Sequence, residues 1–153
     1  MQRRSLLQGL ALLAAGAAAA LPAQSRTAVE VWKDPYCGCC KDWVTHLESH
    51  GFTVKVHDTG NAAMRKRLKV AEKYGSCHTA LVAGYALEGH VPAREVQRLL
   101  REKPAALGLA VPGMPIGSPG MEQGDRQDPF DVVLFGDNDQ RQVFATHGRA
   151  EEG

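Results

Sequence analysis

The 153-residue sequence has no excess of charge of either sign, no internal repeat and no long run of like charges. It contains 18 Lys and Arg residues against 17 Asp and Glu residues, a formal net charge of +1. Without residues 1–25 the chain would lose Arg3 and Arg4, leaving 16 basic against 17 acidic residues, a formal charge of −1. No basic patch survives in the remainder, which argues against nucleic acid or an anionic membrane as the partner.

The sequence also lacks the motifs of several common enzyme classes. It has no phosphate-binding loop, no dinucleotide-binding fingerprint and no Ser-His-Asp arrangement of the kind that hydrolases use. A nucleotide-dependent enzyme and a hydrolase are therefore unsupported.

The chain does have four cysteines, and three of them, Cys37, Cys39 and Cys40, fall within four positions. The fourth is Cys77. A disulfide between the neighbours Cys39 and Cys40 would strain both the peptide and the bridge. Closely spaced thiolates are instead what a soft metal ion such as Cu(I) requires, and one sulfur can bridge several such ions. The cysteines therefore predict a metal site.

Three other interpretations of the cysteines remain open. The four thiols could form two stabilising disulfides in an exported protein. Cys37 and Cys40 also form a C-x-x-C pair at the start of an expected helix, where the helix N-terminus favours thiolate and redox chemistry. Zinc would accept four cysteines in a tetrahedral site. Spacing alone does not separate metal binding from redox chemistry, but the additional Cys39 and Cys77 favour a metal, and vicinal bridging thiols favour copper over zinc.

Residues 1–25 have the features of an export signal. Arg3 and Arg4 give a positive start, residues 6–21 form a short apolar run rich in alanine, and small residues follow at possible cleavage points. The arginine pair resembles a twin-arginine signal. The alternative is an uncleaved anchor helix, although the run is short for a membrane span. We expect export, cleavage, no stable membrane association afterwards, and one domain over residues 26–153.

The remaining chain alternates short strands and helices. Apolar periodicity and turn residues predict strands over residues 28–32, 52–57, 79–83 and 85–90, and helices over residues 39–50, 61–75 and from 92 onward. This order, βαβαββα, predicts an α/β fold with a thioredoxin-like core. In that core the first two strands are parallel, the third is antiparallel to the first, and the fourth is antiparallel to the third.

The predicted topology brings distant residues to one edge of the sheet. The start of the third strand would lie beside the end of the first, so Cys77 would meet the turn at residues 37–40. His90, at the end of the fourth strand, would return to the same edge and is a candidate ligand. His78 is a weaker candidate, because strand alternation would point its side chain away from that of Cys77.

Residues 104–121 are rich in proline and glycine and are expected to leave the core as a long loop. Their leucines and valine need burial, unlike the residues of a disordered linker. Long ordered loops are often functional covers, and we expect this one to fold over the cysteine cluster. Met114, a thioether on a stiff part of the loop, could be an exchangeable Cu(I) ligand. Residues 131–135 and 142–145 then predict a terminal β-hairpin.

Four blocks of the sequence together resemble the domain-of-unknown-function 411 family. These are small exported metal-binding proteins that include CopG-type periplasmic copper-resistance proteins. The resemblance runs over about residues 29–135, in the blocks DPYCGCC from Asp34, SCHTA from Ser76, GY with EGHVPA from Gly84, and GLAVPGMP running into GSPGME from Gly108. It implies a thioredoxin-like fold, a periplasmic location, and a copper cluster held by Cys37, Cys39, Cys40 and Cys77.

These observations predict a periplasmic copper-binding protein for copper handling and resistance. The four cysteines, with His90 and Met114, would hold Cu(I), as a multinuclear cluster with shared sulfurs or with redox cycling between Cu(II) and Cu(I). The expected partners are copper ions and other periplasmic copper-handling proteins. A metal-binding protein is favoured over an enzyme. The alternative is an exported thiol–disulfide oxidoreductase that uses Cys37 and Cys40.

Overall fold

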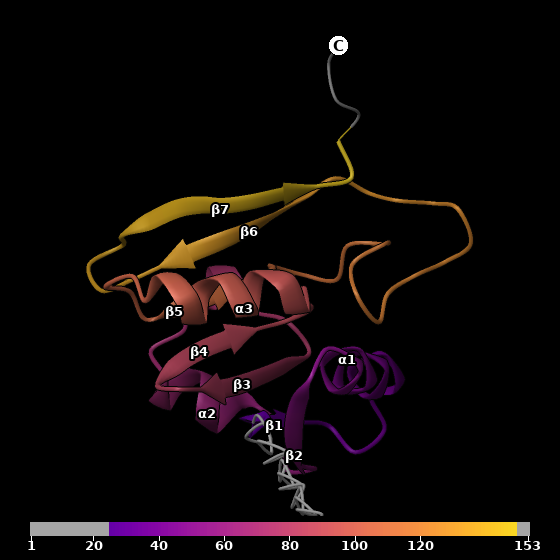
Figure 1. The fold of residues 1–153 in the computed structure, drawn as a ribbon, viewed down its shortest axis with the longest axis horizontal. Helices are drawn as coiled ribbons and strands as arrows, with labels where there is room; N and C mark the ends of the chain where they lie inside the picture. Colours follow the sequence, from indigo (N-terminus) through magenta and orange to yellow (C-terminus); the bar gives the residue numbers. More distant parts are fainter. Residues whose placement is uncertain (1–24, 150–153) are drawn as a thin grey trace, which may run out of the picture.

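The computed structural model describes residues 25–149, so the predicted export signal, except its last residue, lies outside the described residues. Within this range the chain is a mixed α/β domain built on one sheet (Figure 1). In chain order its elements are β1 (Thr27–Lys33), α1 (Gly38–Ser49), β2 (Phe52–His57), α2 (Ala62–Arg67), the 3₁₀ turn η1 (Glu72–Tyr74), β3 (His78–Val82), β4 (Tyr85–Glu88), α3 (Ala93–Glu102), β5 (Gly108–Ala110), β6 (Phe130–Phe135) and β7 (Arg141–His147). No helix between residues 25 and 149 has the length and apolar character needed to cross a bilayer.

The first four strands pair as the sequence predicts. β1 is parallel to β2, with Val29 opposite Val54, and the crossover between them is α1. β3 is antiparallel to β1 and β4 is antiparallel to β3. Lys33, the last residue of β1, lies opposite His78, the first residue of β3. This register places the residue before His78 beside the turn that follows β1.

Apolar side chains cover both faces of the sheet, whose strand order is β2-β1-β3-β4-β5-β6-β7. On one face α1 and α3 pack their buried residues against the strands. These helix residues are Trp43, Val44, Leu47, Val96 and Leu99. On the other face a smaller cluster joins Val70 and Tyr74 to strand residues of β4, β5 and β6. Since successive strand residues point to opposite faces, Leu109 belongs to the first cluster and Ala110 to the second.

The predicted helix over residues 61–75 is wrong in length. α2 ends at Arg67, Lys69 has a φ of 57°, and only the short turn η1 follows. The helix stops because Lys69 adopts the left-handed conformation and the Val70 amide donates to the Arg65 carbonyl, a C-terminal capping pattern that turns Val70 into the apolar cluster on the second face. Asn61 does not cap α2 with its side chain; its amide donates to the Ser76 carbonyl and to Thr79 instead.

The prediction that residues 104–121 leave the core as one loop is also wrong in part. Gly108–Ala110 forms β5, fully buried in the sheet, parallel to β4 and antiparallel to β6. Gly108 permits this pairing, since a Cβ there would lie 1.9 Å from the Ala86 carbonyl oxygen. The predicted hairpin is confirmed as β6 and β7, and β5 joins it to the rest of the sheet. The thioredoxin-like assignment of the core stays a prediction.

Candidate metal centre

The four cysteines come together at one edge of the sheet, from two distant segments. Cys37 occupies the N-cap position of α1, Cys39 and Cys40 lie in its first turn, and Cys77 directly precedes β3. The turn after β1 is fixed by two hydrogen bonds: the Cys37 amide donates to the Asp34 carbonyl, and the Tyr36 amide donates to the Asp34 carboxylate. The pairing of β1 with β3 then sets Cys77 against this turn.

The sulfur atoms are within reach of a shared ion. All four Sγ atoms lie within 4.8 Å of one another. Cys39 Sγ is 3.5 Å from Cys37 Sγ and 3.8 Å from Cys77 Sγ. Cys40 is fully buried, and its sulfur lies 3.6 Å from the Cys77 carbonyl oxygen. The convergence that the sequence predicts for these four residues is therefore present in the structure.

The sulfurs are not all in the same oxidation state. Cys37 and Cys40 form a disulfide, whereas Cys39 and Cys77 are free thiols. The structure thus shows an oxidised C-x-x-C pair next to two reduced cysteines. A site with four thiolate ligands requires two electrons to open this disulfide.

His90 faces the cluster with one ring nitrogen. Its Nε2 lies 3.2 Å from Cys77 Sγ, and its Nδ1 lies 2.7 Å from the Pro119 carbonyl oxygen. Because a carbonyl only accepts, Nδ1 carries the proton and Nε2 presents its lone pair toward the sulfur. Burial lowers the pKa of His90 and keeps the ring neutral. A carbonyl that fixes the tautomer in this way is a common arrangement behind a metal-binding histidine.

His78 also reaches the cluster, contrary to the expectation from strand alternation. Its Nδ1 lies 3.5 Å from Cys77 Sγ, and Cys77, His78 and His90 form a second group of close ligand atoms. The alternation argument failed because Cys77 lies just outside β3, where side chains do not alternate. Burial lowers the pKa of His78 to about 3, its ring packs against Trp43, and its Nε2 has no partner among the described residues.

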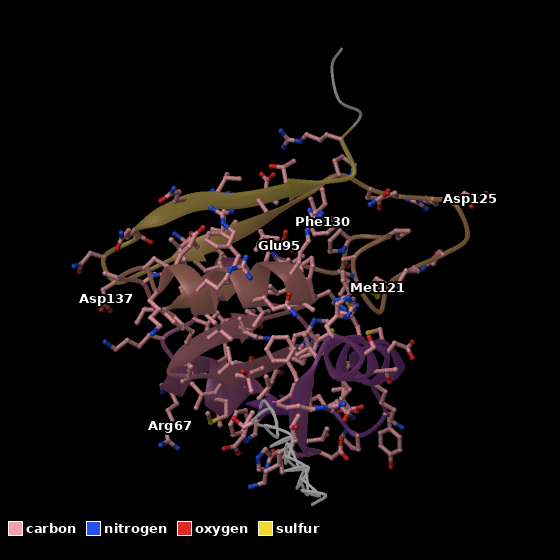
Figure 2. The ribbon with its side chains drawn as sticks, in the orientation of Figure 1. Arg67, Glu95, Met121, Asp125, Phe130 and Asp137 are labelled. Atoms are coloured by element: carbon pink, nitrogen blue, oxygen red, sulfur yellow. A yellow bond between two sulfur atoms is a disulfide. The ribbon has the colours of Figure 1, made fainter. Side chains whose placement is uncertain are left out.

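The loop between β5 and β6 packs against this edge of the sheet, as predicted. Figure 2 places Met121 on the stretch of the loop nearest α1. One residue earlier, the Cα of Gly120 is so close to α1 that a Cβ would lie 2.6 Å from the Cys39 carbonyl oxygen. At the other side of the cluster, Ser76 Oγ donates to the Gly113 carbonyl. The loop therefore contacts the segments that carry both groups of cysteines.

Met114 lies at the rim of the site. It is 53% exposed and lines an open groove of about 470 Å³ together with Cys77. Arg65 and Glu72 form the polar wall of the groove. Met114 is thus near the predicted centre, and its role as a ligand stays a prediction.

Cys77 is protonated at neutral pH in the metal-free protein. The pKa of its thiol is raised to about 11, mainly by burial and in addition by the neighbouring Cys39. A bound cation would reverse this balance, because a metal favours the thiolate.

The raised pKa has a measurable consequence for reactivity. With the Cys37–Cys40 disulfide intact and no metal present, Cys77 should react with iodoacetamide about tenfold more slowly near pH 8 than an ordinary cysteine, because only the thiolate attacks. Its rate should rise with pH up to about 11. Cys39→Ser removes the second cause and should shift this rise to lower pH. Mass spectrometry of the alkylated peptides measures the rate, and a midpoint near pH 9 would contradict the expectation.

Comparison with known proteins identifies the family. The model of the family described as "Protein of unknown function, DUF411" matches residues 74–121. Two solved structures named Copper resistance protein copG, Form 2 and Form 1, are 47% identical to this chain, each with a TM-score of 0.76. They cover 80% and 81% of this chain, which in turn covers 99% of each. The chain belongs to the DUF411/CopG-like family. No curated protein matches it.

The match to the DUF411 model includes the second half of the site. Residues 74–121 contain Cys77, His78 and His90, the strand β5 and the loop through Met121. The cysteines of α1 precede this range, but the two CopG structures cover four fifths of the chain. The family resemblance predicted from sequence is therefore confirmed.

Proposed function

We propose that this chain is a periplasmic copper-binding protein that takes part in copper resistance. Cys37, Cys39, Cys40 and Cys77 bind Cu(I) as thiolates, with His90 as a nitrogen ligand and Met114 as an exchangeable thioether. The observation that carries the proposal is the convergence of four sulfur atoms from two distant segments within 4.8 Å. The choice of copper as the metal is supported by the names of the two similar structures, which are copper resistance proteins.

The geometry fits thiolate ligation. Two sulfurs bound to one ion through bonds of about 2.3 Å lie roughly 3.8 to 4.0 Å apart at tetrahedral to trigonal angles. Cys39 Sγ and Cys77 Sγ are 3.8 Å apart without any rearrangement. Four sulfurs this close can also share ions, and soft thiolate and thioether donors select Cu(I). A multinuclear cluster with bridging sulfurs is the form that we propose.

The proposal also includes export of the chain. Residues 1–25 direct the chain to the periplasm, where copper ions and other copper-handling proteins are its partners. There the Cys37–Cys40 pair can also supply electrons: two thiolates that close to a disulfide release two electrons, which reduce two Cu(II) ions to two Cu(I) ions. Repeated Cu(II)/Cu(I) cycling by the same sulfurs needs an external thiol reductant that returns two electrons to the disulfide after each round.

The thiol–disulfide oxidoreductase alternative is not favoured. The disulfide between Cys37 and Cys40 is compatible with it, but the similar structures are named for copper resistance. Two further thiols and two imidazoles beside the pair also exceed what disulfide exchange needs.

The test of this function is a Cu(I) titration of the anaerobically reduced protein. We expect more than one Cu(I) per chain, measured by metal analysis after competition with a Cu(I)-specific chelator. Met114→Ala should weaken binding severalfold without changing the fold, because its side chain is half-exposed. Unchanged copper retention in the double variant Cys39→Ser with Cys77→Ser would overturn the proposal, as would a preference for Zn²⁺ over Cu(I).

A further inference from the structure

A buried carboxylate lies directly behind the candidate metal centre. Glu88, the last residue of β4, is fully buried. Its Oε1 accepts hydrogen bonds from the Ser76 amide at 2.8 Å and from Arg65 Nε at 2.9 Å. Its Oε2 accepts one from the Thr79 hydroxyl. None of these three donors is a candidate metal ligand.

The hydrogen bonds of this network converge on Ser76. Glu88 accepts a hydrogen bond from the Ser76 amide, while Arg65 Nη2 and Asn61 Nδ2 both donate to the Ser76 carbonyl oxygen. The Ser76 hydroxyl donates to the Gly113 carbonyl of the loop. The backbone donor and acceptor of Ser76 and its side chain are therefore all fixed. The next residue is Cys77, so this network sets where the Cys77 backbone begins.

Such a network is costly to bury. A carboxylate and a guanidinium removed from water lose several kcal/mol of hydration each, and apolar residues of similar volume often stabilise a fold equally well. Burial accordingly raises the pKa of Glu88, while the hydrogen bonds from Thr79, Ser76 and Arg65 act against this shift. Burial of the Glu88–Arg65 pair therefore adds little net stability. Its presence is better explained by the one geometry that its hydrogen bonds fix at the Ser76 peptide.

We propose that Glu88 and Arg65 are positioning residues for Cys77. By clamping the Ser76 peptide, they hold the Cys77 sulfur opposite Cys39 before any metal binds. The benefit of this arrangement rests on the proposed function: if Cys39 and Cys77 are already aligned, binding an ion costs less conformational entropy. The positioning itself can be measured in the absence of copper.

The measurement is the effective concentration of the Cys39 and Cys77 thiols. In a Cys37→Ser and Cys40→Ser background only these two thiols remain. Their disulfide forms by exchange with oxidised glutathione: each Cys39–Cys77 bond made converts one oxidised glutathione into two reduced molecules. The equilibrium constant gives the effective concentration, which reports how well the fold aligns the two sulfurs.

Glu88→Gln should lower this effective concentration at least tenfold, because the amide nitrogen that replaces Oε2 cannot accept from Thr79 and the uncharged group holds Arg65 and the Ser76 amide less strongly. The matched control is Glu95→Gln, which neutralises another buried carboxylate that contacts Arg94 and His147. It should leave the value unchanged. Arg65→Lys retains the charge but loses the forked contact to Glu88 and Ser76, and should lower the value severalfold.

The outcomes separate positioning from general stability. Equal values for Glu88→Gln, Glu95→Gln and the parent protein would overturn the proposal, and so would equal decreases in both glutamine variants. If Glu88→Gln does not fold by circular dichroism, Arg65→Lys decides in the same assay. If Glu88→Gln lowers the effective concentration and Glu95→Gln does not, but the wild-type protein binds no Cu(I), the positioning role stands and the copper function is wrong. If the wild-type protein binds Cu(I) but Glu88→Gln does not lower the effective concentration more than Glu95→Gln does, the copper function stands and the positioning role is wrong.

Discussion

Reduction of the Cys37–Cys40 disulfide should raise the Cu(I) capacity of this protein from at most one ion to more than one ion per chain. In the oxidised form only Cys39 and Cys77 are thiols, with His90 close to Cys77. Disulfide sulfurs are poor metal ligands, because the thiolate is the ligand form of cysteine. Two-electron reduction supplies two further thiolates within 4.8 Å of the others. We expect the first ion to bind the oxidised form at least about 100-fold more weakly, or about 2.7 kcal/mol.

The experiment compares anaerobic Cu(I) titrations of the same preparation before and after treatment with a phosphine reductant. The variant Cys37→Ser with Cys40→Ser is the control, since it should behave like the oxidised protein whether or not reductant is present. Equal copper capacity in the oxidised and reduced wild-type protein would show that Cys37 and Cys40 are structural. In that case the proposed four-sulfur site would have to be abandoned.

Gly120→Ala should detach the loop from the candidate metal centre and destabilise the reduced, metal-free protein by about 2 to 4 kcal/mol. Gly120 has a φ of 89°, and an added Cβ would lie 2.6 Å from the Cys39 carbonyl oxygen and 2.9 Å from the Trp43 amide nitrogen. Both are backbone atoms of α1, which cannot move without moving the cysteines. The neighbouring Pro119 carbonyl would then also leave His90 Nδ1.

Gly113→Ala is a matched control within the same loop. Gly113 also has a positive φ, of 69°, but an added Cβ would meet no atom within 4 Å. It should therefore cost only the backbone strain, about 1 kcal/mol. Urea denaturation gives the free energy of unfolding of both variants, and a Cu(I) titration gives their copper affinity. Equal losses of stability in the two variants would mean that the contact with α1 does not hold the loop.

Much of the site could be predicted because its signals are local. The spacing of Cys37, Cys39 and Cys40 is read directly from the sequence, and the strand order follows from the alternation of short elements. Given that order, the pairing of β1 with β3 places Cys77 at this edge, and the pairing of β3 with β4 returns His90 to it. The loop lies beside the cysteines as predicted, but not through its apolar residues: Leu109 is buried in β5, and the contacts at the site come from Gly113, Pro119 and Gly120.

Other features depend on contacts between segments that no local pattern encodes. β5 has only three residues, fewer than periodicity can reveal, and it exists because Gly108 can approach Ala86. α2 ends early because Lys69 adopts the left-handed conformation at its C-terminus, which turns Val70 into the apolar cluster. His78 joined the site because Cys77 lies one residue outside its strand.

The sequence by itself determined which residue types could bind a metal, the family, and the order of the first four strands. Only the tertiary structure decided which cysteines are paired, which imidazole nitrogen faces Cys77, and that Glu88 and Arg65 hold the Ser76 peptide. The physical reason is the range of the interactions. Periodicity and turn chemistry act over a few residues, whereas a disulfide partner or a buried hydrogen bond is chosen by packing between segments far apart in the chain.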